Sequence, residues 1–248
     1  MGLSVTVLGC SGSYAAVGGA CTGYLVETPG ARVWLDAGPG TLANLQRHIA
    51  PADLDAVVLT HEHPDHWLEI PVFVNVLKHF TPPNGPIPVF LTAGTAALLH
   101  TFHPDAQAPD GPVDLHRIDA ASEVVVGDQQ WHFSRTDHPV ETLAVHVSAG
   151  EDTFAFTADT GPGWSLAAFG RPIGLAFSES SLPDREPWPD VAHLTPHEAA
   201  ERAVEAGVEQ LVLTHLPPGA DPEHHRSTAA AVFGRPVGMA QVGATFSV

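Results

Sequence analysis

One stretch of the sequence decides the fold: Ala56-Val57-Val58-Leu59-Thr60-His61-Glu62-His63-Pro64-Asp65-His66. It begins as a continuous apolar run, which is typical of a strand covered on both faces. It then passes directly into four candidate metal ligands within six residues, His61, His63, Asp65 and His66. Imidazoles and carboxylates without a thiolate suit zinc, manganese or iron. A loop of solvated histidines is the alternative, but the rigid strand before them favours a metal site.

The chain repeats this strand once, as Leu211-Val212-Leu213-Thr214-His215. Both copies are apolar and both end in Thr-His. Folds of the α/β class place their ligands at the carboxyl ends of their strands. We therefore predict two related halves of one sandwich, with strand ends that converge on a site containing both His61 and His215.

Strand-like and helical runs alternate throughout the chain, which predicts the α/β fold class. We expect helices over 41–48 and 67–79, and a meander of strands over 131–136, 142–148 and 153–157. The clearest helix begins at the capping box Thr195-Pro196-His197-Glu198 and ends at Gly207. No linker divides the chain, so residues 1–248 are expected to form a single domain.

The composition argues against a polyanionic partner. Asp and Glu number 28 and Lys and Arg 10, which gives a formal net charge of −18, and Lys78 is the only lysine. Binding to nucleic acids or anionic membranes depends on neutralising phosphates, so we expect neither a nucleic-acid polymer nor a membrane as a partner. A small anionic substrate is compatible with this charge where metal ions supply the positive charge.

The N-terminal residues and the cysteines indicate a cytoplasmic protein. The first residues lead straight into a strand-like run without a basic region or a cleavage site, and no apolar run approaches the length of a membrane span. Cys10 and Cys21 form no Cys-x-x-Cys pattern, so we expect free thiols in a reducing compartment, with a disulfide between them as the alternative.

The pattern His-x-His-x-Asp-His, after an apolar strand ending in Thr, resembles the signature of the metallo-β-lactamase superfamily. The resemblance covers essentially the whole chain. Val7–Ser13 is similar to the opening strand and Gly/Ser loop of the ribonuclease Z-like branch, and Leu35–Gly40 is similar to the motif that follows it. Three further residues match the later motifs: His138, Asp159 and His215. The resemblance implies a four-layer αββα sandwich of the metallo-β-lactamase type.

The same resemblance implies a centre of two divalent metal ions, with zinc as the first candidate and manganese or iron as alternatives. One ion would be held by His61, His63 and His138 and the other by Asp65, His66 and His215, with Asp159 between them. Two such ions roughly 3.5–4 Å apart share a water and lower its pKa, so that hydroxide forms near neutral pH. With two carboxylates and hydroxide included, the site keeps a charge of about +1 and attracts a phosphodiester.

Further residues are expected to support catalysis, with Asp65 and His193 as the candidate catalytic residues. His193 matches a His that the ribonuclease Z-like and cyclic-nucleotide phosphodiesterase branches carry before a helix. There it would stabilise developing charge or protonate the leaving oxygen. The alternative is a His that only flanks the helix. Asp36 and Glu179 are expected to orient ligands from behind, and a turn-forming Asp is the alternative for Asp36.

Within the resembled superfamily, the sequence favours a phosphodiesterase acting on small phosphodiesters such as cyclic nucleotides, by attack of the metal-bridging hydroxide. The missing export signal disfavours a β-lactamase, and the short, weakly basic C-terminal segment disfavours a thioesterase. The nearest alternative is a ribonuclease Z-like tRNA 3′ endonuclease, but the arm expected between His138 and Asp159 is missing, and residues 139–158 contain no Lys or Arg. A metal-binding module with little catalysis is an alternative of another class. Related enzymes are often dimers, so a homodimer is compatible with the resemblance.

Overall fold

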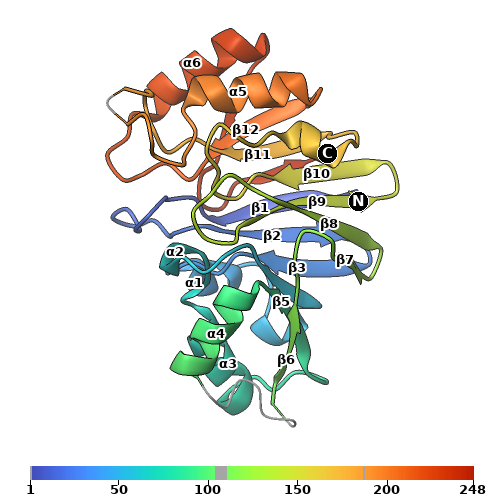
Figure 1. Cartoon of the computed structure of the whole chain (residues 1–248). Coiled ribbons are helices and arrows are strands. Elements are labelled where there is room, and N and C mark those ends of the chain that lie inside the picture. The colour runs from blue at the N-terminus through green and yellow to red at the C-terminus, as the bar shows by residue number, and fades with distance from the viewer. Residues whose placement is uncertain (1, 104–110, 187) are drawn as a thin grey trace.

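The computed structural model describes residues 2–103, 111–186 and 188–248, and in this part of the chain two seven-stranded sheets lie face to face (Figure 1). The first sheet contains, in spatial order, β14 (Thr245–Ser247), β1 (Ser4–Gly9), β2 (Gly23–Thr28), β3 (Ala31–Leu35), β4 (Ala56–Leu59), β5 (Ile87–Leu91) and β6 (Val113–Arg117). The second contains β13 (Gly238–Met239), β12 (Gln210–Thr214), β11 (Leu175–Glu179), β10 (Asp152–Phe156), β9 (Leu143–Ala149), β8 (Gln129–Arg135) and β7 (Glu123–Val126).

Helices cover the outer side of each sheet (Figure 1). Beside the first sheet lie α1 (Thr41–Leu45), the 3-10 turn η1 (Pro51–Asp53), α2 (Pro64–Trp67), α3 (Ile70–His79) and α4 (Ala93–Phe102). Beside the second lie the 3-10 turn η3 (Leu166–Phe169), α5 (Pro196–Glu205) and α6 (Pro222–Phe233). This arrangement confirms the four-layer αββα sandwich. No helix in the described ranges has the length and apolar character that a membrane span requires.

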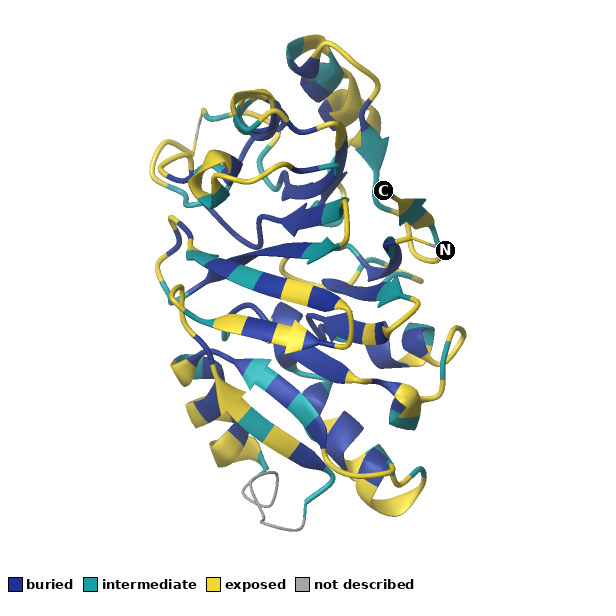
Figure 2. Ribbon diagram, turned by 90° about the vertical axis from the view of Figure 1, so that its right-hand side faces the viewer, coloured by how far each residue is buried: buried dark blue, intermediate teal, exposed yellow. Residues whose placement is uncertain are grey.

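Three apolar clusters of described residues fill the spaces between these layers. Between the sheets, Tyr24 packs edge to face on Phe156 and Phe177, with ring centroids 5.1 and 5.2 Å apart. Under the first helix layer, Trp34 contacts Phe73 of α3 in the same way, at 5.4 Å. A third cluster joins the second sheet to α5 and α6. Figure 2 shows the buried residues gathered in the strands and on the inner sides of the helices.

The two similar strands occupy equivalent places in the two sheets. β4 lies between β3 and β5 and is parallel to both, and β12 lies in the same way between β11 and β13. Alternate residues of β4 serve different clusters, because Val58 packs between the sheets whereas Val57 and Leu59 pack under the helices. Burial on both faces explains the continuous apolar runs, and the two predicted halves of a sandwich are observed.

Several expected elements are present with small changes in length. The meander consists of β8, β9 and β10, each antiparallel to the next. The expected capping box begins α5, because Thr195 Oγ1 accepts from the Glu198 N–H and the Glu198 carboxylate accepts from the Thr195 N–H. The helix expected over 41–48 is shorter, since regular α-helix covers only α1.

The helix expected over 67–79 is wrong as a single element. The chain instead forms α2, a break at Leu68 and Glu69, and then α3, which carries Pro71 in its first turn. Proline has no N–H with which to continue a helix, so a new helix begins there. The structure also contains α4, which the sequence interpretation did not include. Short α2 lies so close to Gly38 that a Cβ there would meet the Asp65 carbonyl oxygen at 2.0 Å.

Candidate metal centre

Strand ends from both sheets meet at one place. His61 follows β4, His215 follows β12, and Asp159 and His138 lie just beyond β10 and β8. The metal ligands expected from the sequence lie here in two groups, His61, His63, His138 and Asp159 in one, and Asp65, His66 and His215 in the other. Within each group, the candidate ligand atoms all lie within 4.8 Å of one another.

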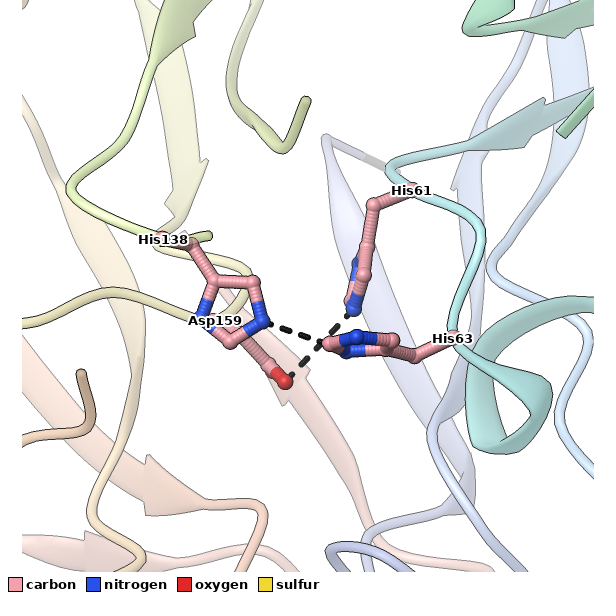
Figure 3. Close-up of side chains that lie close together, drawn as sticks. All are labelled: His61, His63, His138 and Asp159. Carbon is pink, nitrogen blue, oxygen red and sulfur yellow. Dashed lines mark hydrogen bonds and ion pairs between the residues drawn. The ribbon is translucent and has the colours of Figure 1, made fainter. Parts of the chain in front are cut away.

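In the first group, three imidazoles and a carboxylate point toward a common centre (Figure 3). His138 Nε2 lies 3.1 Å from His63 Nδ1, and His61 Nε2 lies 3.6 Å from Asp159 Oδ2. His61 is completely buried, and its Nε2 has no hydrogen-bond partner among the described residues. A buried polar atom without a partner is costly, and a cation at the centre of the group would satisfy it.

The second group adjoins the first through Asp159. His66 Nε2 lies 3.2 Å from His215 Nε2, which lies 3.3 Å from Asp65 Oδ2. Asp159 Oδ1 lies 3.3 Å from each of these two imidazole nitrogens. The two oxygens of Asp159 therefore face different groups, which is the position expected for a carboxylate between two ions.

Asp36 holds two of the imidazoles from behind. Its Oδ2 accepts from His66 Nδ1 at 2.7 Å and from the Thr60 hydroxyl at 2.9 Å, while its Oδ1 accepts from the Thr60 N–H at 2.8 Å. Because the Thr60 hydroxyl gives its proton to Asp36, it accepts one from His61 Nδ1, 3.0 Å away. In their neutral forms, both imidazoles therefore turn an unprotonated Nε2 toward the centre, as a metal ligand does.

Two more imidazoles are held in the same orientation. The Ser181 hydroxyl donates to Glu179 Oε2 at 2.7 Å, so it accepts from His215 Nδ1 at 2.9 Å. His138 Nδ1 donates to the Ala192 carbonyl at 3.2 Å. These rings also turn an unprotonated Nε2 inward.

The donor set fits divalent cations. If His66 and His215 are both neutral, their Nε2 lone pairs face each other across 3.2 Å, so this contact needs a proton or a metal cation beside it. Neutral imidazoles and ionised carboxylates are the ligands of zinc, manganese and iron, and a hydrogen bond behind each imidazole is usual in such sites. The residues present therefore suit a metal pair.

Charge at the site favours a cation. Burial opposes ionisation of Asp65 and Asp159, but the neighbouring imidazoles outweigh burial and hold the pKa of both carboxyls below its ordinary value. Burial also opposes a charged His66, yet Asp159 and Asp36 raise its pKa well above the usual value. Burial and the adjacent imidazoles lower the pKa of His61. The carboxylates that attract a proton to His66 attract a metal cation to the same place.

Among the described non-glycine residues, left-handed backbone is concentrated at this site. The described non-glycine residues with positive φ are Ser13 (64°), Asp36 (56°), Ala158 (50°) and His215 (58°). Ala158 precedes Asp159, and the Ser13 N–H donates to Asp65 Oδ2 at 2.7 Å. Such conformations cost on the order of 1–3 kcal/mol each and cluster at functional sites, where the surrounding structure fixes them.

His193 lies beside the two groups. Its Nδ1 is 2.8 Å from Glu179 Oε1, and one of its ring nitrogens is within 4.8 Å of ligand atoms of Asp159 and His215. Its ring stacks on that of His215, with centroids 5.8 Å apart. Burial opposes protonation, but the Glu179 carboxylate outweighs it and raises the pKa of His193 to about 9. His193 therefore lies beside the ligands of the candidate centre, with Glu179 bound to its ring.

Most of the chain matches one known family, because residues 31–216 match the Beta-lactamase superfamily domain. The chain belongs to the metallo-β-lactamase superfamily. Members of this superfamily are metal-dependent hydrolases, so the His/Asp cluster is the metal-binding site of such a hydrolase.

Individual members of the superfamily resemble the chain over nearly its full length. Uncharacterized protein Rv1339 of Mycobacterium tuberculosis is 31% identical over 255 residues, which cover 98% of this chain and 92% of that protein. Probable metallo-hydrolase YhfI of Bacillus subtilis is 30% identical over 255 residues, covering 97% and 98%. Ribonuclease Z of Methanopyrus kandleri is 27% identical over 270 residues, covering 93% of each.

Solved structures of the superfamily share the fold. The crystal structure of YhfI covers 100% of both chains with a TM-score of 0.90 and 25% identity. A diphosphatase from the PhnP family has a TM-score of 0.81 over 100% of this chain and 98% of its own, and at 17% identity it shows the common fold alone.

Thr60 and Ser181 contribute hydrogen bonds to this superfamily centre that the sequence interpretation did not assign. Thr60 orients His61 and Ser181 orients His215. For Thr60 the sequence carries one signal, since both similar strands end in Thr-His. Ser181 stands in an ordinary Ser-rich loop, and only the folded chain brings it to His215.

Proposed function

We propose that the chain is a dinuclear metal-dependent phosphodiesterase that hydrolyses small phosphodiesters such as cyclic nucleotides. The observation that carries the proposal is the position of Asp159, whose two oxygens face two separate groups of ligands. Two adjacent divalent ions suit displacement at phosphorus, where both the attacking and the leaving oxygen carry charge.

The ligand groups assign the residues that would hold each ion. His61, His63 and His138 would hold one and Asp65, His66 and His215 the other, with Asp159 shared. Zinc is the first candidate for both positions, with manganese and iron as alternatives, because no thiolate is present in either group. Such a pair supplies Lewis acidity and lowers the pKa of water.

In this proposal His193 donates a proton and Asp65 positions the water. Glu179 accepts from His193 Nδ1, which leaves Nε2 as the atom that gives a proton to the leaving oxygen. Asp65 Oδ2 accepts from the Ser13 N–H at 2.7 Å and is thereby held beside His215, where it orients the attacking water. The Glu179 contact keeps the His193 ring turned toward the centre.

A small substrate suits the chain better than a folded RNA. Residues 139–158 contain the β9–β10 hairpin and no Lys or Arg, and the formal net charge is −18. Few counterions would be released when such a surface met a polyanion, so binding to RNA would be weak. The ribonuclease Z among the relatives favours phosphodiester chemistry, and a tRNA 3′ endonuclease without the arm is the second candidate.

A hydrolysis panel tests the proposal under matched salt and metal. The substrates are a 3′,5′-cyclic mononucleotide, bis(p-nitrophenyl) phosphate, precursor tRNA, a β-lactam and a glutathione thioester. We expect kcat/KM for at least one of the first two to exceed that for each of the others by about tenfold or more. His61→Ala should abolish turnover, which excludes a contaminating hydrolase as the source.

Two results would overturn the proposal. Faster hydrolysis of the thioester than of every phosphodiester would assign another reaction to the site. Bound metal without turnover of any substrate would favour a metal-binding module with little catalysis.

A further inference from the structure

Arg185 makes five hydrogen bonds within the chain, although it belongs to the loop that approaches the metal centre. Its Nε and Nη2 donate to the two Glu198 carboxylate oxygens at 3.0 and 2.5 Å. Its Nη1 donates to the Trp188 and Val191 carbonyls at 3.3 and 2.9 Å, and its Nη2 also donates to the His193 carbonyl at 2.7 Å.

These bonds account for the whole donor capacity of the side chain. A guanidinium has five N–H groups, and each of the five is used in these contacts. The Glu198 carboxylate also neutralises the charge of Arg185. Arg185 therefore has no N–H left for a substrate phosphate, and its function must be to hold the loop.

Glu198 anchors this arrangement to a helix. It stands in the first turn of α5, where its carboxylate also accepts from the Thr195 N–H and hydroxyl, at 2.9 and 3.0 Å. Burial disfavours its ionisation, but the hydrogen bonds from Arg185 and Thr195 outweigh burial and lower the pKa of Glu198. The side chains of Arg185 and Glu198 are only 25% and 17% exposed, so solvent competes weakly for the pair.

The segment that Arg185 holds carries two groups of the site. The Ala192 carbonyl accepts from His138 Nδ1 at 3.2 Å, and the next residue is His193. Glu179 fixes the His193 ring from one side, at 2.8 Å, while Arg185 fixes its carbonyl from the other, at 2.7 Å. The ring and the backbone of His193 are thus fixed independently.

We propose that Arg185 is a positioning residue which, anchored on Glu198, holds the backbone of residues 188–193 so that His193 reaches the leaving oxygen of the substrate. This inference rests on the proposed phosphodiesterase function. It assigns to Arg185 an effect on the proton-donating step that passes through His193, and no direct contact with substrate; an unchanged metal content would show that the Ala192 contact to His138 persists without Arg185.

The variants Arg185→Met, Arg185→Lys and His193→Ala, and the double variant with Arg185→Met and His193→Ala, test this inference. Arg226→Met is the matched control, because Arg226 forms a two-point pair with Glu223 within α6, at 2.9 and 2.6 Å, and its side chain is 45% exposed. Each protein is assayed on a cyclic mononucleotide, whose leaving alkoxide needs a proton, and on bis(p-nitrophenyl) phosphate, whose leaving nitrophenolate does not.

We expect Arg185→Met to lower kcat on the cyclic mononucleotide by about tenfold to a hundredfold, and by at most about threefold on the nitrophenyl ester. Arg185→Lys should recover part of the loss. In the His193→Ala background, Arg185→Met should change kcat by less than about twofold, because the residue acts through His193. Amide hydrogen exchange should rise in residues 188–193 of Arg185→Met and stay unchanged in Arg226→Met, with the bound metal per chain unchanged in both.

Two outcomes would overturn the inference while leaving the proposed function intact. In one, wild-type protein hydrolyses phosphodiesters but Arg185→Met lowers kcat on both substrates equally. In the other, the loss is as large in the His193→Ala background as in the wild type. If wild-type protein hydrolyses no phosphodiester, the proposed function fails first, and the exchange measurement still reports whether Arg185 holds the segment.

Discussion

A single carboxylate fixes the orientation of two metal-site imidazoles in this chain. Asp36 contacts His66 directly and reaches His61 through the Thr60 hydroxyl. It is completely buried and has a positive φ of 56°, so the fold accepts backbone strain to place it there. Asp36 thus acts on the orientation of both rings from behind the site.

Asp36→Asn should weaken metal binding while the fold persists. The amide cannot accept from both His66 and Thr60 with the strength of a carboxylate, so we expect affinity for zinc to fall by about 10–100-fold. Competition with a chromophoric chelator measures this change, and Asp114→Asn, at an exposed position, is the control. An unchanged affinity for zinc would show that Asp36 only stabilises the turn in which it lies.

The Cys10 thiol, which is not a candidate metal ligand, provides a test of how stability depends on pH. Burial raises the pKa of its thiol from 9.0 to about 11, and the structure contains both Cys10 and Cys21 as free thiols. A thiol with a raised pKa in the folded state stabilises the fold below pH 9, and this contribution is lost as the pH rises from 9 to 11.

The free energy of unfolding should therefore fall between pH 9 and 11, by up to about 2 kcal/mol more in wild type than in Cys10→Ser. Urea unfolding at pH 8 and pH 10.5 measures the difference between the two proteins. Equal pH dependence in both would place the titrating group elsewhere.

At the scale of elements, caps set the boundaries of the helices that cover the second sheet. Asp221 precedes α6, and its Oδ1 accepts from the Glu223 and His224 N–H groups at 2.9 and 3.3 Å. Pro222 stands in the first turn and Gly234 ends the helix with a φ of 73°. These are the start and stop signals that the sequence carries for this helix.

Asp221→Ala should destabilise α6 without affecting catalysis. Loss of an N-cap carboxylate costs about 1 kcal/mol, which corresponds to a decrease in Tm of roughly 2–4 °C for a chain of this size. Calorimetry measures the shift, and an unchanged kcat/KM shows that the cap does not act on the site. A Tm equal to that of wild type would mean that α6 is held by packing alone.

Much of the architecture could be predicted because the apolar pattern of each segment matches the burial of its side chains in the folded chain. Two similar strands, one ending at Leu59 and the other at Thr214, are covered on both faces. Their continuous apolar sequence therefore predicted that they lie inside the sheets. The helix over 67–79 was wrong because its apolar pattern continues through a region that Pro71 divides. The spacing of apolar residues does not indicate such a break, whereas the proline, which lacks an N–H, does.

The site could be predicted where ligands follow strands or stand in one motif, as His61 and His66 do. The contacts of Arg185 could not, because they depend on how the loop before α5 folds back on itself. The same holds for Ser181, which reaches His215 across 34 positions of sequence. Every residue has a backbone carbonyl, so the sequence does not indicate which carbonyl accepts a hydrogen bond. Such contacts are visible only in the folded chain.

At the scale of the whole molecule, the net charge supports the proposal of a small substrate in preference to a large RNA. The net charge is −18, and the hairpin in the place of an RNA-binding arm has no basic residue. In the proposed function, the positive charge that attracts the substrate comes from the metal pair. This electrostatic attraction acts close to the ions, so it acts on one phosphodiester group at a time.

Precursor tRNA should accordingly be a poor substrate. We expect a higher kcat/KM for a cyclic mononucleotide or an aryl phosphodiester than for precursor tRNA, and weak tRNA binding with little sequence preference at physiological salt. Parallel kinetics and filter binding at two salt concentrations measure both quantities. Specific cleavage at the 3′ trailer that outpaces every small substrate would contradict the argument from the missing arm.

We propose that each of the two ligand groups holds one divalent ion, with Asp159 shared by both. Elemental analysis of protein purified without a chelator tests it most directly. We expect close to two ions per chain in the wild type, as in other two-metal sites, and a clear loss of metal in Asp159→Ala and His61→Ala. Wild-type protein that folds normally and carries no bound metal would contradict the claim.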